Sequence, residues 1–354
     1  MTCQKQFSRE KSKRVKPYKL QQNIDWNVMQ TSARNAIRWT ITILGFLLTM
    51  NLAHAAEDIL LEPVKVSAHV YYFHGQSGMA SAANLGFMSN AGFVVTNTDV
   101  IVFDALGTPA LGKAMMAAIR KISAKPIKRV IVSHYHADHF YGLQAFKEDN
   151  IEIWAHENGR ADLESDNARE RLVQRKSDLS PWVNDLTRLT PADRWLSFKE
   201  GKPILFESGG IHFRIIDSSG AHSPDDIMLF VEEDKVLFAG DLYFTGRIPF
   251  VGNADSKAWL AALDRMLEVH PAIVIPGHGE ASSAPDKDMA LTREYLVFLR
   301  KNMGEAVENM VQFDDAYKQI DWSRFKNIPA FQQANRINAY GTYLLMEQTS
   351  LHKQ

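Results

Sequence analysis

Four side chains of types that commonly bind metal ions lie within six consecutive residues of this sequence. They are His134, His136, Asp138 and His139, in the segment SHYHADHFYG that follows the apolar stretch 130–132. A buried strand that ends just before them would bring these side chains to one edge of a sheet, where they can converge. Imidazole and carboxylate are ligands that zinc accepts, so the spacing predicts a metal site rather than a polar surface loop.

Three further candidate ligands stand in the same position relative to other apolar stretches. His222 follows a predicted strand, Asp241 directly follows the run VLFAG, and His278 directly follows the run IVIPG. Each of these residues alone is more often a capping or solvated group. Together with the first motif, they predict a cluster of five histidines and two aspartates.

With these seven residues, the sequence resembles the metallo-β-lactamase superfamily from about residue 64 to residue 279. The resemblance implies an α+β fold, a four-layer αββα sandwich with a two-metal site in a groove at one edge. It also implies the ligands, namely His134, His136 and His222 for the first metal, Asp138, His139 and His278 for the second, and Asp241 bridging both. Asp104, in the segment FDALG, matches an aspartate near the site in the family, and we expect it to orient a ligand.

The ligand types favour two Zn²⁺ ions, and the oxygen-richer second site leaves iron or manganese open there. Five neutral imidazoles and two carboxylates around four metal charges leave a net positive site, which favours hydroxide at neutral pH. The predicted reaction is hydrolysis, in which a metal-bridging hydroxide attacks a carbonyl and Asp138 orients the attacking water. From Ala56 onward there is no cysteine and no Gly-x-Ser-x-Gly elbow, in agreement with a mechanism that needs no protein nucleophile.

The sequence leaves the small-molecule substrate open among esters, thioesters, lactones and β-lactams. Asp241 stands where the cysteine-containing β-lactamases of the superfamily place a thiolate, and the pattern is more similar to glyoxalase II and lactonases. Residues 238–252 resemble exported metallohydrolases found with sulfur-oxidation or quinoprotein systems. In that segment, Arg247 is a candidate to pair with a substrate carboxylate and Tyr243 a candidate to form a wall of the groove.

Two alternatives from other functional classes stay open. One is a mononuclear iron persulfide dioxygenase, which shares the HxHxDH scaffold but oxidises sulfur. The other is an exported metal-binding relay protein without turnover. The irregular segment 177–202, with Trp182 and Trp195, is a candidate lid over the site.

The charge distribution divides the chain into two unlike parts. Residues 1–55, the leader, hold nine of the 40 Lys and Arg and two of the 41 Asp and Glu, which leaves 31 basic against 39 acidic residues in the body. This excess of acids argues against a nucleic-acid partner, because phosphate contacts come from clustered Lys and Arg. A composition with 45% hydrophobic and 23% charged residues excludes a disordered or low-complexity protein.

The leader has the order of a secretory signal peptide. Its basic residues precede the apolar run 39–52, and small residues follow at Ala53 and Ala55, so we expect cleavage and a periplasmic protein. The apolar run is short for a bilayer span of ~20 residues, so any membrane contact would come through an uncleaved leader. Met29 is an alternative start, and Cys3, the single cysteine, leaves the body without a disulfide.

Strands and helices alternate through a predicted hydrolase domain of residues 56–285, and residues 286–354 form a helical extension packed on it. Expected strands cover 61–73, 92–96, 100–104, 130–132, 151–155, 204–206, 211–216, 227–231, 236–239 and 272–275, and expected helices 111–122, 157–176, 255–269, 289–312 and 331–351. In the last helix, residues 334–347 have apolar residues at helical spacing. We expect them to pack on the sandwich, with a homodimer surface as the alternative.

Overall fold

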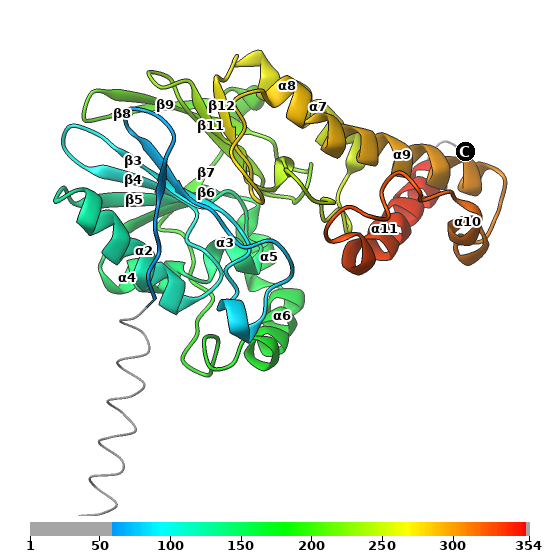
Figure 1. Cartoon of the computed structure of the whole chain (residues 1–354), viewed down its shortest axis with the longest axis horizontal. Helices are drawn as coiled ribbons and strands as arrows, with labels where there is room; N and C mark the ends of the chain where they lie inside the picture. Colours follow the sequence, from blue (N-terminus) through cyan, green and yellow to red (C-terminus); the bar gives the residue numbers. More distant parts are fainter. Residues whose placement is uncertain (1–58, 352–354) are drawn as a thin grey trace, which may run out of the picture. The chain divides into compact units, whose positions relative to one another are not determined.

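The structure is a computed structural model, and it describes residues 59–351; the leader and its predicted signal peptide lie outside these residues. Two β-sheets form the centre of this part of the chain (Figure 1). The first sheet contains, in spatial order, β1 (Val64–Lys65), β2 (Val70–Phe73), β3 (Ala91–Val95), β4 (Val100–Phe103), β5 (Ile127–Ile131), β6 (Glu152–His156) and β7 (Arg194–Leu196). The second contains β12 (Ile273–Ile275), β11 (Val236–Phe238), β10 (Ile227–Val231), β9 (Ile211–Asp217) and β8 (Ile204–Ser208).

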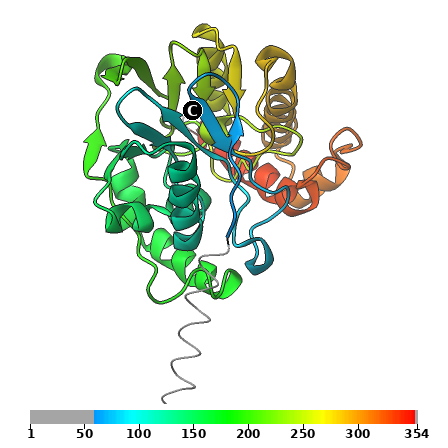
Figure 2. The ribbon, with the colours of Figure 1, turned by 60° about the vertical axis from the view of Figure 1, so that its left-hand side comes forward.

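Helices cover the outer face of each sheet (Figure 2). Those that follow strands of the first sheet are α2 (Pro109–Ile122), α3 (Ala137–Phe140), α4 (Leu143–Glu148), α5 (Gly159–Glu164) and α6 (Asp166–Asp178). Those that come later are α7 (Ser256–Glu268), α8 (Pro285–Asp288), α9 (Ala290–Glu308), α10 (Phe313–Gln319) and α11 (Phe331–Leu351). None of the helices within residues 59–351 combines the length and the apolar character needed to cross a bilayer.

The central strands, such as β4 and β10, are buried on both faces, so alternate side chains point into different cores. In β4, Val100 and Val102 pack in the core beneath α2 and α4, whereas Ile101 and Phe103 face the second sheet. A period of two with apolar residues on both faces is what a strand inside a layered α/β arrangement requires. The resulting order of helix, sheet, sheet and helix confirms the predicted αββα sandwich.

The strand ends meet at one edge because the pairing in the middle of the structure is parallel. In the first sheet, β4, β5, β6 and β7 run parallel, and in the second sheet β11 and β12 run parallel. Parallel neighbours end on the same side, so the loops after β4, β5, β11 and β12 are brought close together. These loops carry most of the predicted metal ligands.

Two predicted elements are divided in the structure. The expected strand 61–73 is broken by a turn in which the amides of Val66 and Ser67 both donate to the Val70 carbonyl. The expected helix 157–176 becomes α5 and α6, because Ser165 caps α6 by accepting a hydrogen bond from the amide of Ala168. Both breaks are local hydrogen-bonding features that a periodicity argument does not detect.

The segment 177–202, predicted to be irregular, contains one short strand, β7, between loops. Trp195 lies in β7, where it pairs with Ala155 of β6, so it belongs to the first sheet. Trp182 donates its indole N–H to the carbonyl of Ala82 at 2.9 Å. Of the two predicted lid residues, only Trp182 therefore lies in a loop.

Phe238 is a central contact between the two sheets. Its ring is 1% exposed and stacks on Phe103 with centroids 5.3 Å apart. We expect Phe238→Ala to lower the free energy of unfolding by about 3–5 kcal/mol, because it removes apolar contacts and leaves a cavity. Urea unfolding followed by circular dichroism measures this value. The control Leu205→Ala, at a side chain 67% exposed, should change it by less than about 0.5 kcal/mol, and equal losses would contradict the packing argument.

Asp234 ties the turn between β1 and β2 to the hairpin of β10 and β11. Burial raises the pKa of its carboxyl, but hydrogen bonds from Ser67 and His69 outweigh this and leave the pKa below its ordinary value. A carboxyl with a depressed folded pKa stabilises the fold above its unfolded pKa of about 3.9, and loses this contribution as pH falls through the folded pKa.

We therefore expect the difference in unfolding free energy between native protein and Asp234→Asn to be constant above about pH 5 and to shrink below about pH 4. Urea unfolding at a series of pH values gives the measurement. A difference that increases toward low pH would show that the hydrogen bonds to Asp234 do not favour its ionised form.

Candidate metal centre

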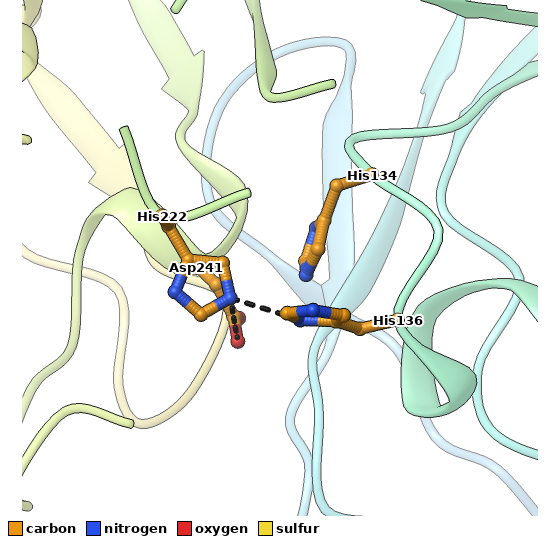
Figure 3. Close-up of side chains that lie close together, drawn as sticks. All are labelled: His134, His136, His222 and Asp241. Carbon is orange, nitrogen blue, oxygen red and sulfur yellow. Dashed lines mark hydrogen bonds and ion pairs between the residues drawn. The ribbon is translucent and has the colours of Figure 1, made fainter. Parts of the chain in front are cut away.

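All seven predicted ligand side chains lie together at the edge where the strands end. Their nitrogen and oxygen atoms form two groups, each with its atoms within 4.8 Å of one another: His134, His136, His222 and Asp241 in the first, and Asp138, His139 and His278 in the second. Figure 3 shows the first group, in which three imidazoles and a carboxylate point toward a common centre. The family resemblance implies the same two sets of three ligands, with Asp241 bridging them.

Each ligand lies just beyond a strand. His134 and His136 follow β5, and Asp138 and His139 lie in α3, the short helix that begins next. The remaining three come from the second sheet: His222 after β9, Asp241 in the 3₁₀ turn η3 (Gly240–Leu242) after β11, and His278 after β12. The site is therefore built from both sheets, and its geometry depends on how the sheets pack.

Asp241 lies between the two groups. One carboxylate oxygen, Oδ1, is 3.0 Å from His139 Nε2 and 3.3 Å from His278 Nε2, and the other, Oδ2, is 3.5 Å from His222 Nε2. Gly277 makes this position available, because a Cβ at that residue would lie 2.0 Å from Asp241 Oδ1. The sequence PGHG thus supplies both a ligand and the space for the carboxylate.

Several polar atoms at the centre are buried without a hydrogen-bond partner. They include His134 Nε2, together with His139 Nε2 and Asp241 Oδ1, which lie 3.0 Å apart but make no hydrogen bond to each other. In addition, His222 Nε2 and His136 Nδ1 face each other at 3.0 Å. Buried polar atoms are normally paired, so a cluster of unpaired nitrogen and oxygen atoms that point inward fits metal ions. Imidazole nitrogens and carboxylate oxygens are the donor set of zinc and related ions.

Hydrogen bonds outside the cluster fix which ring nitrogen faces inward. His278 Nδ1 is 2.7 Å from the Met88 carbonyl, which can only accept, so Nδ1 carries the proton and Nε2 presents its lone pair to the site. His139 Nδ1 donates in the same way to Asp104 Oδ2 at 2.9 Å. Orienting bonds of this kind are typical of histidines that bind metal.

Asp104 organises the first-sheet side of the site. It accepts hydrogen bonds from the amide of Ser133 at 2.7 Å, from Ser133 Oγ at 2.8 Å and from His139. Since Ser133 Oγ gives its proton to Asp104, it accepts from His134 Nδ1 at 2.9 Å, which leaves His134 Nε2 free to bind a cation. Asp104 has a φ of +62°, a left-handed conformation that is uncommon for a residue with a side chain and is held by these contacts.

The two groups differ in their electrostatics. In the first group, burial lowers the pKa of His136 to about 4 and of His222 to about 3, so both imidazoles are neutral at physiological pH. In the second group, burial alone would lower the pKa of His139 and His278, but Asp241 and Asp138 outweigh it and raise both. The carboxylates therefore demand positive charge in the second group, which a metal ion can supply in place of the protons.

The two predicted substrate-binding residues lie in different surroundings. Arg247 is 6% exposed, its Nη1 donates to the Gly78 carbonyl at 3.3 Å, and its Nε has no partner. Burial lowers its pKa, whereas Asp241 and Asp138 raise it, so its guanidinium lies within electrostatic range of the site. Tyr243 is 0% exposed in the core that includes α7 and α9, which favours packing over the substrate contact predicted for it.

Some residues that support the site were not predicted. Ser133 stands directly before the first histidine, and its position next to a buried strand is a signal that could have indicated it. The carbonyl of Met88 and the ring of Trp259, which packs on His222 with centroids 5.0 Å apart, could not be found in this way. Both contacts join residues far apart in the sequence.

The comparisons with known families agree with this geometry. The sequence profile of the metallo-beta-lactamase superfamily matches residues 85–278, more than half of the chain. The chain belongs to the metallo-beta-lactamase superfamily. The members it matches include hydrolases, which supports an enzymatic role for this superfamily member.

Relatives in the superfamily are distant. A linear primary-alkylsulfatase from Pseudomonas sp. is 22% identical over 236 residues, which are 56% of this chain and 44% of that protein. A type 2 metallo-beta-lactamase from Bacillus sp. is 25% identical over 233 residues, 64% of this chain and 76% of that protein. The chain thus spans less than half the length of the alkylsulfatase.

Solved structures of the superfamily show the same fold. A stereoselective inverting sec-alkylsulfatase from Pseudomonas sp. matches with a TM-score of 0.63 and 16% identity, over 80% of this chain and 50% of that chain. A metallo-beta-lactamase from Pontibacter korlensis matches with a TM-score of 0.51 and 19% identity, over 67% of this chain and 99% of that chain. The alkylsulfatase likeness therefore covers more of this chain than the family profile does.

Asp104 offers a test of the orienting contacts. We expect Asp104→Ala to weaken metal affinity about 10–100-fold, because His139 and Ser133 lose the acceptor that fixes them. Competition with a chelator measures the affinity. Asp99→Asn is the matched control, since Asp99 is a buried carboxylate at the other end of β4 that binds Ser208 and leaves the cluster untouched. Equal affinities for all three proteins would remove Asp104 from the site.

Proposed function

We propose that the protein is a binuclear zinc hydrolase that cleaves esters, thioesters, lactones or β-lactams of small molecules. The observation that carries the proposal is the pair of ligand groups that share Asp241. His134, His136 and His222 would hold one ion, and Asp138, His139 and His278 the other. When bound, the ions would polarise the substrate oxygen and lower the pKa of the attacking water.

Asp138 is the residue best placed to handle a proton. Its side chain is 22% exposed, against 5% for Asp241, so solvent can reach its carboxylate. Hydrogen bonding and charge from His139 and His278 outweigh burial and hold the pKa of Asp138 below its ordinary value, so the carboxylate is ionised. Asp138 Oδ2 would accept the proton of the attacking water and return it to the leaving group.

Arg247 would bind an anionic group of the substrate. Its guanidinium is nearly buried, has an unpartnered Nε and lies within electrostatic range of the catalytic carboxylates. A buried arginine with free donors suits a carboxylate or sulfate, because the planar fork can form two parallel hydrogen bonds.

Sulfate esters are a second candidate substrate class. Two relatives support it: the curated linear primary-alkylsulfatase and the solved sec-alkylsulfatase, whose fold likeness extends over 80% of this chain. An anionic sulfate ester also matches the charge of Arg247. We propose a periplasmic location for this hydrolase, on the basis of the signal peptide expected in the leader.

Metal content and turnover of the exported form test the proposal. We expect about two zinc ions per chain. We also expect hydrolysis of at least one member of a panel that contains nitrocefin, a glutathione thioester, a homoserine lactone and an alkyl sulfate. One iron per chain with oxygen uptake would instead support the persulfide dioxygenase, and two bound ions without turnover would support the relay protein.

Asp138→Asn separates catalysis from binding of the ions. We expect kcat to fall about 10²–10⁴-fold, because the proton acceptor is lost, while the protein keeps at least the ion of the first group. The control Asp178→Asn, at a surface carboxylate of α6, should leave kcat unchanged. An unaltered kcat in Asp138→Asn would rule out the proposed proton transfer.

A further inference from the structure

The loop that carries Arg247 lies against the metal centre. Residues 243–252, here the Arg247 loop, follow Asp241 and contain two turns with positive φ, at Gly246 (+67°) and Gly252 (+50°). Phe244 of this loop stacks on the ring of His278 with centroids 5.1 Å apart and an interplanar angle of 8°. A movement of the loop would therefore shift Arg247 relative to the site.

The side chain of Asn338 in α11 makes three hydrogen bonds to the backbone of this loop and a fourth to Tyr295. Its Oδ1 accepts from the amides of Val251 at 2.8 Å and Gly252 at 3.2 Å, and its Nδ2 donates to the Pro249 carbonyl at 2.8 Å. The second Nδ2 proton goes to Tyr295 Oη at 3.0 Å. Asn338 is 0% exposed, so each of these bonds is protected from water.

These bonds matter because the loop has little backbone pairing of its own. Residues 249–252 belong to neither a helix nor a strand, and buried backbone groups need a partner wherever they lie. Asn338 provides it for three of these four residues, Pro249, Val251 and Gly252. Two more hydrogen bonds join the Arg247 loop to the helical extension of residues 286–354. Thr292 Oγ1 donates to the Phe244 carbonyl at 3.1 Å, and the Ile248 amide donates to the Pro329 carbonyl at 2.9 Å.

At Gly341, helix α11 approaches the loop too closely to leave room for a side chain. A Cβ on Gly341, one turn after Asn338, would lie 1.8 Å from the Gly252 carbonyl oxygen. Two further hydrogen bonds lead from Tyr295 away from the loop and complete a buried polar network. Tyr295 Oη donates to Asn335 Oδ1, and Asn335 Nδ2 donates to Tyr317 Oη. Asn335 is as buried as Asn338, but it contacts only other helices.

We propose that Asn338 is a positioning residue for substrate recognition, which holds the Arg247 loop so that Arg247 binds an anionic group of the substrate. The inference rests on the proposed hydrolase function and extends it to the C-terminal helices. Through Asn338, α11 contributes to substrate specificity, although it provides none of the candidate metal ligands. The selected substrate class is a small ester that carries a carboxylate or sulfate.

The test uses two acetyl esters that differ in one charge, 4-acetoxybenzoate and its methyl ester. In Asn338→Ala we expect KM for 4-acetoxybenzoate to rise about 10-fold or more, because a charge-assisted hydrogen bond is weakened. KM for the methyl ester should stay within about twofold. Arg247→Ala should show the same pattern, and adding Asn338→Ala to it should cause little further change, since both act through one contact.

Asn335→Ala is the matched control, because it removes an equally buried amide from the same helix and the same network. It should lower stability but leave the ratio of the two KM values unchanged. Gly341→Ala gives a second route to the loop, and we expect it to shift the ratio as Asn338→Ala does. Equal effects of Asn338→Ala on both esters, or a changed ratio in Asn335→Ala, would overturn the inference.

Two readouts do not depend on turnover. Hydrogen exchange at the amides of Val251 and Gly252 should accelerate in Asn338→Ala and not in Asn335→Ala. Binding of the inert analogue 4-acetamidobenzoate, followed by calorimetry, should weaken in Asn338→Ala and in Arg247→Ala. If native protein hydrolyses neither these esters nor any member of the substrate panel but shows this binding pattern, the hydrolase proposal fails and the role of Asn338 stands; unchanged exchange and binding would remove that role.

Discussion

The contact on which the site depends is that of His139 with three carboxylates. Its Nδ1 is 2.9 Å from Asp104, and its Nε2 is 3.0 Å from Asp241 and 3.6 Å from Asp138. Three acidic groups in a buried space repel one another unless positive charge lies between them. The Nδ1–H of His139 fixes the direction of Asp104, and cations bound at the inward-facing Nε2 would supply the positive charge between Asp241 and Asp138.

The fold brings these side chains together because four loops meet at one edge of the sandwich. The parallel pairs β4–β5 and β11–β12 end on the same side, and the core between the sheets sets the distance between them. Gly277 has no side chain and so leaves room for the Asp241 carboxylate, and Asp104 adopts a left-handed backbone conformation beside the site. Packing of the sheets and chemistry of the site are thus determined by the same contacts.

The clustering of the seven candidate ligands could be predicted from the sequence because such a density of histidine and aspartate after apolar stretches is rare by chance. His222, Asp241 and His278 could be joined to the first motif since each follows a strand, whereas Asp104 was assigned only through family resemblance. Ser133 and the Met88 carbonyl were not predicted, because their roles depend on contacts between distant segments. For the same reason, the apolar spacing of residues 334–347 predicted a packed helix but not that Asn335 and Asn338 would be its most connected members.

The contact of His222 with Trp259 has a practical consequence. The indole is 0% exposed, and its N–H donates to the Leu242 carbonyl at 2.8 Å, so the ring is held rigidly beside one of the imidazoles. A change of charge at that imidazole alters the electric field across the indole, to which tryptophan emission is sensitive. Trp259 is therefore placed to report, as an intrinsic fluorophore, on a cation that binds at His222.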